Sequence, residues 1–167
     1  MKSRDGGGVL LSQAIHTMDQ LVDLFGVPAE VCGFHATNPL RRIDTEDVVA
    51  GALRWLNGAI GTLDATTTSF PTIPERIDIA AEHGSATLER AHLRVWLRDG
   101  TTIDEQEDTA LPAVTGDYLV YRSLIADVLD ALDDDRQPSC SGESALGVHR
   151  LIDVLMRPGA SAVAEPV

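Results

Sequence analysis

The chain has 167 residues, of which 44% are hydrophobic and 23% are charged, a composition typical of one globular domain with a buried core. Thirteen lysine and arginine residues stand against 26 aspartate and glutamate residues, which leaves a formal net charge of -13. Such a surface repels phosphate backbones and anionic lipid headgroups, so we expect neither nucleic acid nor a membrane surface as a partner.

The chain shows no targeting or metal-binding pattern. Met1–Asp5 leads into glycines rather than into an apolar signal-peptide core, and no apolar run reaches the roughly 20 residues that a membrane-spanning helix needs. Cys32 and Cys140 are too few for a disulfide framework and too far apart for a CxxC metal site, so we expect two buried free thiols. These features predict a cytoplasmic protein without a metal site.

The first predicted element is a helix over Val9–Phe25, in which apolar residues recur at helical spacing. It follows a run of three glycines and is expected to end at Gly26 and Pro28, as helices commonly do. Polar residues also recur on this helix, at spacings of four, three and four residues. They are Ser12, His16, Asp19 and Asp23. The helix should therefore carry one apolar face and one polar stripe.

Strands are expected after this helix. Glu46–Leu56 and Ala59–Thr68 flank Asn57-Gly58, a dipeptide that favours a two-residue type I′ turn between paired strands. Further short alternating runs follow, and the last of them is an edge strand within Asp99–Asp108. Because the runs follow one another as hairpins, the sheet should be mainly antiparallel.

Two more helices complete the predicted fold. Asp117 is expected to cap a helix with a buried apolar stripe, and the last helix should begin near Ser141. One helix, a run of hairpins and two helices predict an α+β fold, with an open-faced, mainly antiparallel β-sheet and helices packed on one face. We expect a single domain over residues 1–159 and a frayed tail over residues 160–167.

The uncovered face of this sheet should form an interface. Apolar residues such as Trp55 and Leu56 are expected on it, and an apolar face of this kind needs another domain or another subunit. We therefore predict homo-oligomers, specifically dimers formed sheet to sheet.

His16 is the leading candidate for chemistry, because histidines exchange protons near neutral pH and Ser12 or Asp19 lies one predicted turn away. The alternative is an exposed histidine on a solvated helix face. These three residues do not predict a hydrolase triad, since side chains on one stripe point outward together and do not converge. The glycine run lacks the preceding strand and the GxGxxG spacing of a dinucleotide-binding fold.

Several segments, taken in chain order, match the sequence features of one known family. Gly6–Asp19 is similar to the signature GGGxLxDxGxHxxD. The later segments lie at strand starts, turns and helices: Glu46-Asp47, Asn57–Gly61, Glu82–Ala86, Leu124–Leu132 with Pro138, and Ser141–Leu146. As an ordered set that covers almost the whole chain, they resemble the C-terminal domain of the glucose–fructose oxidoreductase / inositol dehydrogenase / MocA family.

This resemblance implies the substrate-binding and oligomerisation domain of an NAD(P)-dependent oxidoreductase that acts on a sugar, an inositol or a related polyol. His16 matches the family's proton-transferring histidine, and Ser12, Gln13 and Asp19 are the implied substrate-binding residues. Ser12 occupies the place of a family aspartate, and Ala14 replaces a glycine. The serine can hydrogen-bond to a substrate hydroxyl, but it cannot be an anionic base at neutral pH.

In that family an N-terminal Rossmann domain holds NAD or NADP and supplies a lysine from an EKP-type motif, and this sequence contains neither. The chain should therefore be inactive unless such a domain joins it in cis or in trans, because the cofactor must be held against the substrate. Three hypotheses stay open: a fragment or truncated form of a dehydrogenase, a stand-alone non-catalytic binding or interaction module, and an enzyme that uses His16 without a nicotinamide. The substrate and the choice between NAD and NADP stay open too.

Overall fold

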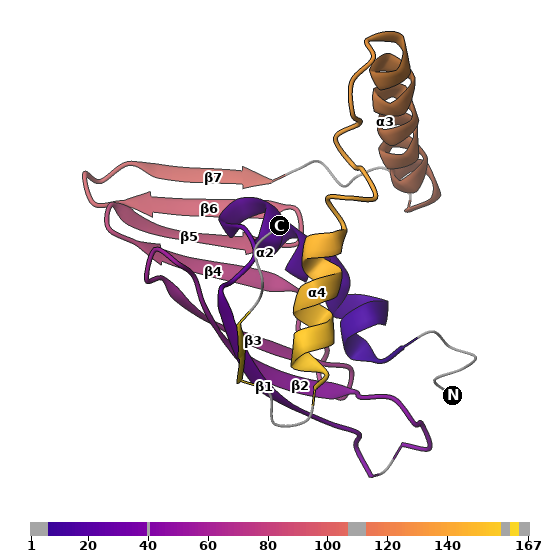
Figure 1. The fold of residues 1–167 in the computed structure, drawn as a ribbon. Helices are drawn as coiled ribbons and strands as arrows, with labels where there is room; N and C mark the ends of the chain where they lie inside the picture. The colour runs from indigo at the N-terminus through magenta and orange to yellow at the C-terminus, as the bar shows by residue number, and fades with distance from the viewer. Residues whose placement is uncertain (1–6, 40, 107–112, 158–160, 164–167) are drawn as a thin grey trace. The chain divides into compact units, whose positions relative to one another are not determined.

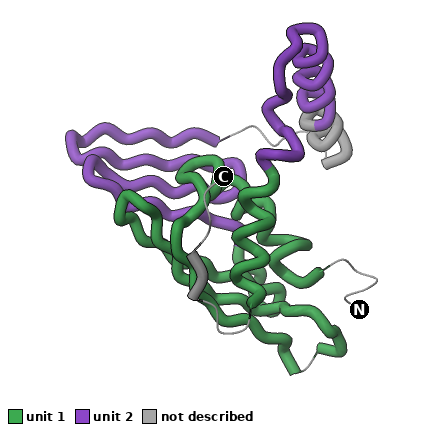
Figure 2. Tube along the Cα trace, in the orientation of Figure 1, with its two compact units in different colours: residues 1–73, 145–167 green, residues 74–144 purple. Residues whose placement is uncertain are grey.

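A computed structural model gives the fold and describes residues 7–39, 41–106, 113–157 and 161–163 (Figure 1). The elements in chain order are η1 (Leu10–Ala14), α2 (Ile15–Phe25), β1 (Glu30–Ala36), β2 (Val48–Arg54), β3 (Ile60–Thr66), β4 (Arg76–Ala81), β5 (Gly84–Glu89), β6 (His92–Leu97), β7 (Thr102–Gln106), α3 (Ala113–Asp133), α4 (Leu146–Leu155) and β8 (Ser161–Val163). The chain divides into two compact units, residues 1–73 with 145–167 and residues 74–144 (Figure 2).

The α+β class is confirmed, with the strands arranged in two four-stranded sheets. Their orders are β3-β2-β1-β8 and β4-β5-β6-β7, and every strand pair in the described residues is antiparallel. The connection between the sheets contains Pro71 and Pro74, which lack the N–H that a ladder hydrogen bond requires. The sequence predicted one sheet, because hairpin spacing alone does not show where a sheet ends.

In the first unit, α4 packs on β1 and α2 packs on α4, so both helices lie on one side of the sheet (Figure 1). Its core is formed by buried apolar side chains from both layers: Leu10, Met18, Val31, Val49, Leu53, Val148, Leu151, Ile152 and Leu155. Gly33 and Gly51 lie opposite each other on neighbouring strands, beneath Leu155. A Cβ on Gly51 would lie 2.9 Å from Leu155 Cδ2, so the missing side chain lets α4 approach the sheet.

The first helix is confirmed, but its first turns differ from the prediction. Leu10–Ala14 form a π-helix, and regular α-helix continues from Ile15 to Phe25. The predicted end at Gly26 is also confirmed. Gly26 has φ 73° and its N–H donates to Val22 O at 2.8 Å, a conformation that glycine adopts without a Cβ penalty.

The hairpin between β2 and β3 is confirmed, but it is not closed by a two-residue type I′ turn. Trp55 N–H donates to Ala59 O, and Gly58 N–H donates to Trp55 O, so the loop contains three residues. Only Gly58 in this loop has a positive φ, of 87°. This arrangement is the three-residue hairpin with glycine in the left-handed region, and Asn57 Oδ1 stabilises it by accepting Ala59 N–H at 3.0 Å.

The hairpin between β6 and β7 repeats this geometry with an aspartate. Leu97 N–H donates to Thr101 O, Gly100 has φ 92°, and Asp99 Oδ1 accepts Thr101 N–H at 2.8 Å. This hydrogen bond favours the carboxylate and lowers the pKa of Asp99 below its ordinary value. Among the described strands, β7 pairs only with β6, so the edge strand predicted within Asp99–Asp108 is confirmed over Thr102–Gln106.

The helix α3 begins at Ala113, so Asp117 lies inside the helix and the predicted N-cap is wrong. Its predicted buried stripe is also wrong, since Tyr121, Ile125 and Leu132 are exposed. Amphipathic spacing indicates that a helix has an apolar face, but it does not supply the surface that buries it.

A hydrogen-bonded turn ends α3. Arg136 N–H donates to Ala131 O, and Asp135 takes a left-handed conformation with φ 51°. Asp127 accepts hydrogen bonds from Ser139 N–H at 2.7 Å and from Arg136 Nη2 at 2.9 Å. The Ser139 amide first, and the Arg136 guanidinium second, lower the pKa of Asp127.

The last helix, α4, begins at Leu146 rather than near Ser141. The residues before it form a turn in which Ser144 N–H donates to Ser141 Oγ at 3.1 Å. The helix ends at Leu155. Part of the segment predicted as a tail is ordered in a ladder, because β8 pairs with β1.

Two further expectations concern the surface. Both cysteines, Cys32 and Cys140, are exposed, so the prediction of buried thiols is wrong. Cys32 lies in the alternation of β1 on the face opposite to Val31, which is the residue that points into the core. No helix in the described ranges is both long enough and apolar enough to cross a membrane. The cytoplasmic location stays a prediction.

Candidate functional site

The sequence-predicted site residues share one helical segment of the first unit. Ser12 and Gln13 lie in η1, and His16 and Asp19 lie in α2. The continuous segment formed by η1 and α2 is called the site helix below. All four side chains are exposed, while Leu10 and Met18 on the opposite side of the segment are buried in the core. The amphipathic sequence therefore orients the helix so that its polar stripe faces solvent, where a ligand can reach it.

The π-helical turn changes how Ser12 relates to His16. A π-helical turn contains more residues than an α-helical turn, so Ser12 is rotated away from the position one α-turn before His16 that the sequence predicted. Ser12 Oγ donates to Gly8 O at 2.8 Å. Because its hydrogen is used there, the hydroxyl oxygen is left as an acceptor. In the described part of the chain, no hydrogen bond joins His16 to Ser12 or to Asp19.

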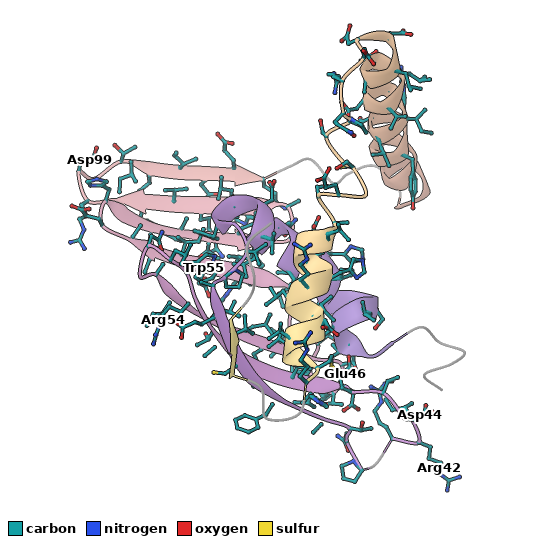
Figure 3. The ribbon with its side chains drawn as sticks, in the orientation of Figure 1. Arg42, Asp44, Glu46, Arg54, Trp55 and Asp99 are labelled. Carbon is teal, nitrogen blue, oxygen red and sulfur yellow. The ribbon has the colours of Figure 1, made fainter. Side chains whose placement is uncertain are left out.

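Glu46 is a residue of this site to which the sequence analysis gave no functional role; it was named only as a strand start and in the family resemblance. It is buried, with 6% of its surface exposed, and it lies just before β2 beside the start of the site helix (Figure 3). Its backbone carbonyl accepts Val9 N–H at 2.9 Å, and its Oε1 accepts Leu10 N–H at 3.3 Å. No local capping pattern could predict this, since 36 residues separate the two partners.

Asp47, the next residue, is also buried and anchors the loop between β1 and β2. Its Oδ1 accepts Asn38 N–H at 2.7 Å, and its Oδ2 lies 3.6 Å from Arg41 Nη1. Arg41 Nη1 also donates to Thr67 Oγ1 at the end of β3. Two adjacent carboxylates therefore fix two different segments: Glu46 fixes the site helix and Asp47 fixes the loop.

Trp55, which was predicted on the uncovered sheet face, lies on the helix side. It packs against the core of the first unit, and its ring centroid is 5.9 Å from that of Phe25. Its Nε1 donates to Gly26 O at 2.9 Å, at the end of α2. Trp55 therefore holds the far end of the site helix, and the prediction for this residue is wrong.

The described residues do not form a Rossmann unit. A Rossmann unit needs parallel strands joined by a helix, and every strand pair described here is antiparallel. Nor do histidine, cysteine, aspartate and glutamate side chains in these ranges gather in any group of three or more that could hold a metal ion. The chemistry available at the helix is proton exchange and hydrogen bonding.

Comparison with known proteins gives one matching family and many similar structures. The family is described as the GFO/IDH/MocA C-terminal domain, and its model matches residues 1–87. This range contains η1, α2 and the two buried carboxylate residues Glu46 and Asp47. No protein of curated function matches the chain.

The similar structures include three oxidoreductases crystallised with a nicotinamide cofactor. The WlbA dehydrogenase from Bordetella pertussis, in complex with NADH and UDP-GlcNAcA, is 25% identical with a TM-score of 0.69, over 89% of this chain and 44% of that chain. Levoglucosan dehydrogenase with NADH is 22% identical with a TM-score of 0.75, over 93% and 49%. An oxidoreductase from Agrobacterium radiobacter, in complex with NAD+, L-tartaric acid and magnesium, is 23% identical with a TM-score of 0.69, over 86% and 44%. The chain thus spans about half the length of these structures.

Proposed function

The chain belongs to the GFO/IDH/MocA C-terminal-domain family, and from this premise we propose that it is the substrate-binding domain of an NAD(P)-dependent oxidoreductase. The substrate class is a sugar, an inositol or a related polyol. The observation that carries the proposal is the family match over residues 1–87, which includes the whole site helix. The similar structures that hold NADH with UDP-GlcNAcA or with levoglucosan support the substrate class.

In this proposal His16 exchanges a proton with a substrate hydroxyl, and Ser12, Gln13 and Asp19 hold that substrate by hydrogen bonds. The exposure of all four side chains supports these roles. Ser12 acts as an acceptor for a substrate hydroxyl, because its own hydrogen is donated to Gly8 O. A serine hydroxyl is not ionised at neutral pH, so the proton exchange falls to His16.

We propose further that the nicotinamide cofactor is held by a Rossmann domain outside the described residues, in the same polypeptide or in a partner. The antiparallel pairing of the described strands supports this. Without that domain the chain binds substrate but does not catalyse the reaction, since the cofactor and the substrate must be held in register.

His16→Ala is expected to weaken sugar or polyol binding by up to about tenfold, because the hydrogen bond that it removes from the bound substrate contributes up to about 1.5 kcal/mol. The probes are levoglucosan and myo-inositol, titrated into the full chain with and without NAD+. The thermal shift is measured for each chain, and the NMR signal of the His16 imidazole is followed in the unmodified chain. His35→Ala removes another exposed histidine of the same unit and should leave the affinity unchanged.

These outcomes separate the candidate functions. Binding that depends on His16 supports the substrate-binding role. A probe affinity that is unchanged in His16→Ala supports a binding module in which the polar stripe of the site helix is only a solvated surface. No stabilisation by either probe, with or without NAD+, contradicts the proposed function and leaves an interaction role.

We propose that the uncovered face of the β3-β2-β1-β8 sheet forms a homodimer interface. It exposes Phe34 and Ile60, with 83% and 79% of their surfaces accessible. Phe34 lies opposite Ala50 of β2, and Ile60 lies opposite Arg54. Light scattering at micromolar concentration should give a dimer, and Phe34→Asp should give a monomer because it places a charge in the apolar interface. Phe70→Asp, at a fully exposed loop position, should leave the dimer intact. A monomeric unmodified chain would contradict this interface.

A further inference from the structure

We propose that Glu46 is a positioning residue for His16, and that it acts by clamping the start of the helix on which His16 lies. The proposal rests on the proposed function of His16. The contacts of Glu46 with Gly8, Val9 and Leu10 are called the Glu46 clamp below.

The clamp holds two successive amides of the helix start with two different atoms of one residue. The Glu46 carbonyl accepts Val9 N–H at 2.9 Å, and the Glu46 carboxylate accepts Leu10 N–H at 3.3 Å. The first amides of a helix have no partner within the helix, so an outside acceptor decides whether they stay ordered. Two acceptors at fixed positions restrain both the position and the rotation of the first turn.

Gly8 leaves the space that this arrangement requires. A Cβ at residue 8 would lie 2.1 Å from the Glu46 carboxyl carbon and 2.2 Å from the Glu46 backbone oxygen. The backbone oxygen cannot move away cheaply, and a shift of the carboxyl group would break its hydrogen bond with Leu10 N–H. Glycine at position 8 therefore allows the helix start to approach Glu46 closely enough for the clamp to form.

The charge of Glu46 favours the same contact. A carboxylate is stabilised at a helix N-terminus, where unpaired N–H groups carry partial positive charge. Glu46 is buried, and none of the cationic side chains in the described ranges pairs with it. Its interaction with the helix start is therefore the contact that offsets part of its cost of burial.

The clamp acts on His16 through a short and unusual segment. Leu10 is the first residue of the π-helix η1, which leads directly into α2, and His16 is the second residue of α2. Helix ends fray unless their amides are paired, so loss of the clamp should disorder η1 and allow Ser12 and His16 to move together. The far end of α2 is held by Trp55 and should not change.

Two conservative variants separate the geometry of the clamp from its charge. Glu46→Asp keeps the charge but shortens the side chain by one methylene, so it should lose the Leu10 contact. Glu46→Gln loses the charge but keeps an oxygen at the same reach. We expect amide hydrogen exchange at Val9–Ser12 to speed up about tenfold in Glu46→Asp and less than about threefold in Glu46→Gln. Glu30→Gln, at an exposed glutamate of β1, should change nothing there.

A second readout distinguishes positioning from general stability. At a temperature where all variants are folded, Glu46→Asp should weaken binding of levoglucosan or myo-inositol about tenfold, with Glu46→Gln near the unmodified affinity. Val31→Ala, a truncation in the core of the same unit, should lower the melting temperature without weakening binding.

Each result decides one question. Unchanged exchange at Leu10 in Glu46→Asp overturns the clamp, whether or not a probe binds. Faster exchange with unchanged probe affinity overturns the positioning role and leaves a structural cap. If neither probe binds the unmodified chain, the proposed function fails, while the exchange data still test the clamp.

Discussion

Leu151→Ala is expected to lower the free energy of unfolding of the first unit by about 3 kcal/mol, one of the two largest effects predicted for this chain. Leu151 is fully buried on α4, within the core formed by that helix and the strands beneath it. The truncation removes apolar contacts and leaves a cavity, because the surrounding core side chains relax only partly into the space. Urea unfolding followed by the fluorescence of Trp55, which packs on this core, measures the loss.

Leu146→Ala is the matched control, because it makes the same substitution on the same helix at a half-exposed position. It should change stability by less than about 0.5 kcal/mol. Equal losses in the two variants would show that the burial of Leu151 does not determine the loss, and would contradict the assignment of this core.

The predictable part of the fold is the part that local patterns determine. Alternation and turn residues predicted β2, β3 and the hairpins of the second sheet, and helical spacing predicted the helix that ends at Gly26. The register of β1 with β2 follows from the same alternation, because it places Val31 and Leu53 together on the core face. In each case the deciding residues lie within a few positions of one another.

The parts that were missed depend on contacts between distant residues. The three-residue loop at Asn57-Gly58 and the two-residue loop share the same dipeptide, and the strand pairing around it decides between them. The same holds for Trp55, whose side was set by Phe25 and Gly26. Helix α3 shows the converse, since its apolar spacing was recognised but its described apolar side chains, such as Ile125 and Leu132, are exposed.

The candidate site divides in the same way. Ser12, Gln13, His16 and Asp19 were found from one helical segment, and the structure exposes all of them. The π-turn and the Glu46 clamp were not found. A carboxylate 36 residues away can cap a helix only when the tertiary fold brings it there, so its role is invisible to a local motif.

Asp47→Ala is expected to lower the free energy of unfolding by about 2 to 3 kcal/mol, the second large effect. The substitution removes a buried carboxylate, which accepts Asn38 N–H with one oxygen and faces Arg41 with the other. The value lies below that of a fully buried ion pair, because Arg41 is 45% exposed and solvent screens its charge. Asp47→Asn keeps an acceptor for Asn38 and should lose about 1 kcal/mol. Urea unfolding measures both variants.

Asp130→Ala, at an exposed aspartate of α3, is the control for removing one negative charge and should be nearly neutral. If it destabilises the chain as much as Asp47→Ala does, net charge and not the loop anchor explains the loss. Amide exchange links this anchor to the site, because Asp47 directly follows Glu46. Freeing the loop in Asp47→Ala should speed exchange at Leu10 as well as at Asn38, but less than Glu46→Asp does, since the clamp atoms themselves remain. Faster exchange at Asn38 without a change at Leu10 would show that Glu46 and Asp47 act independently, and that the site helix depends on Glu46 alone.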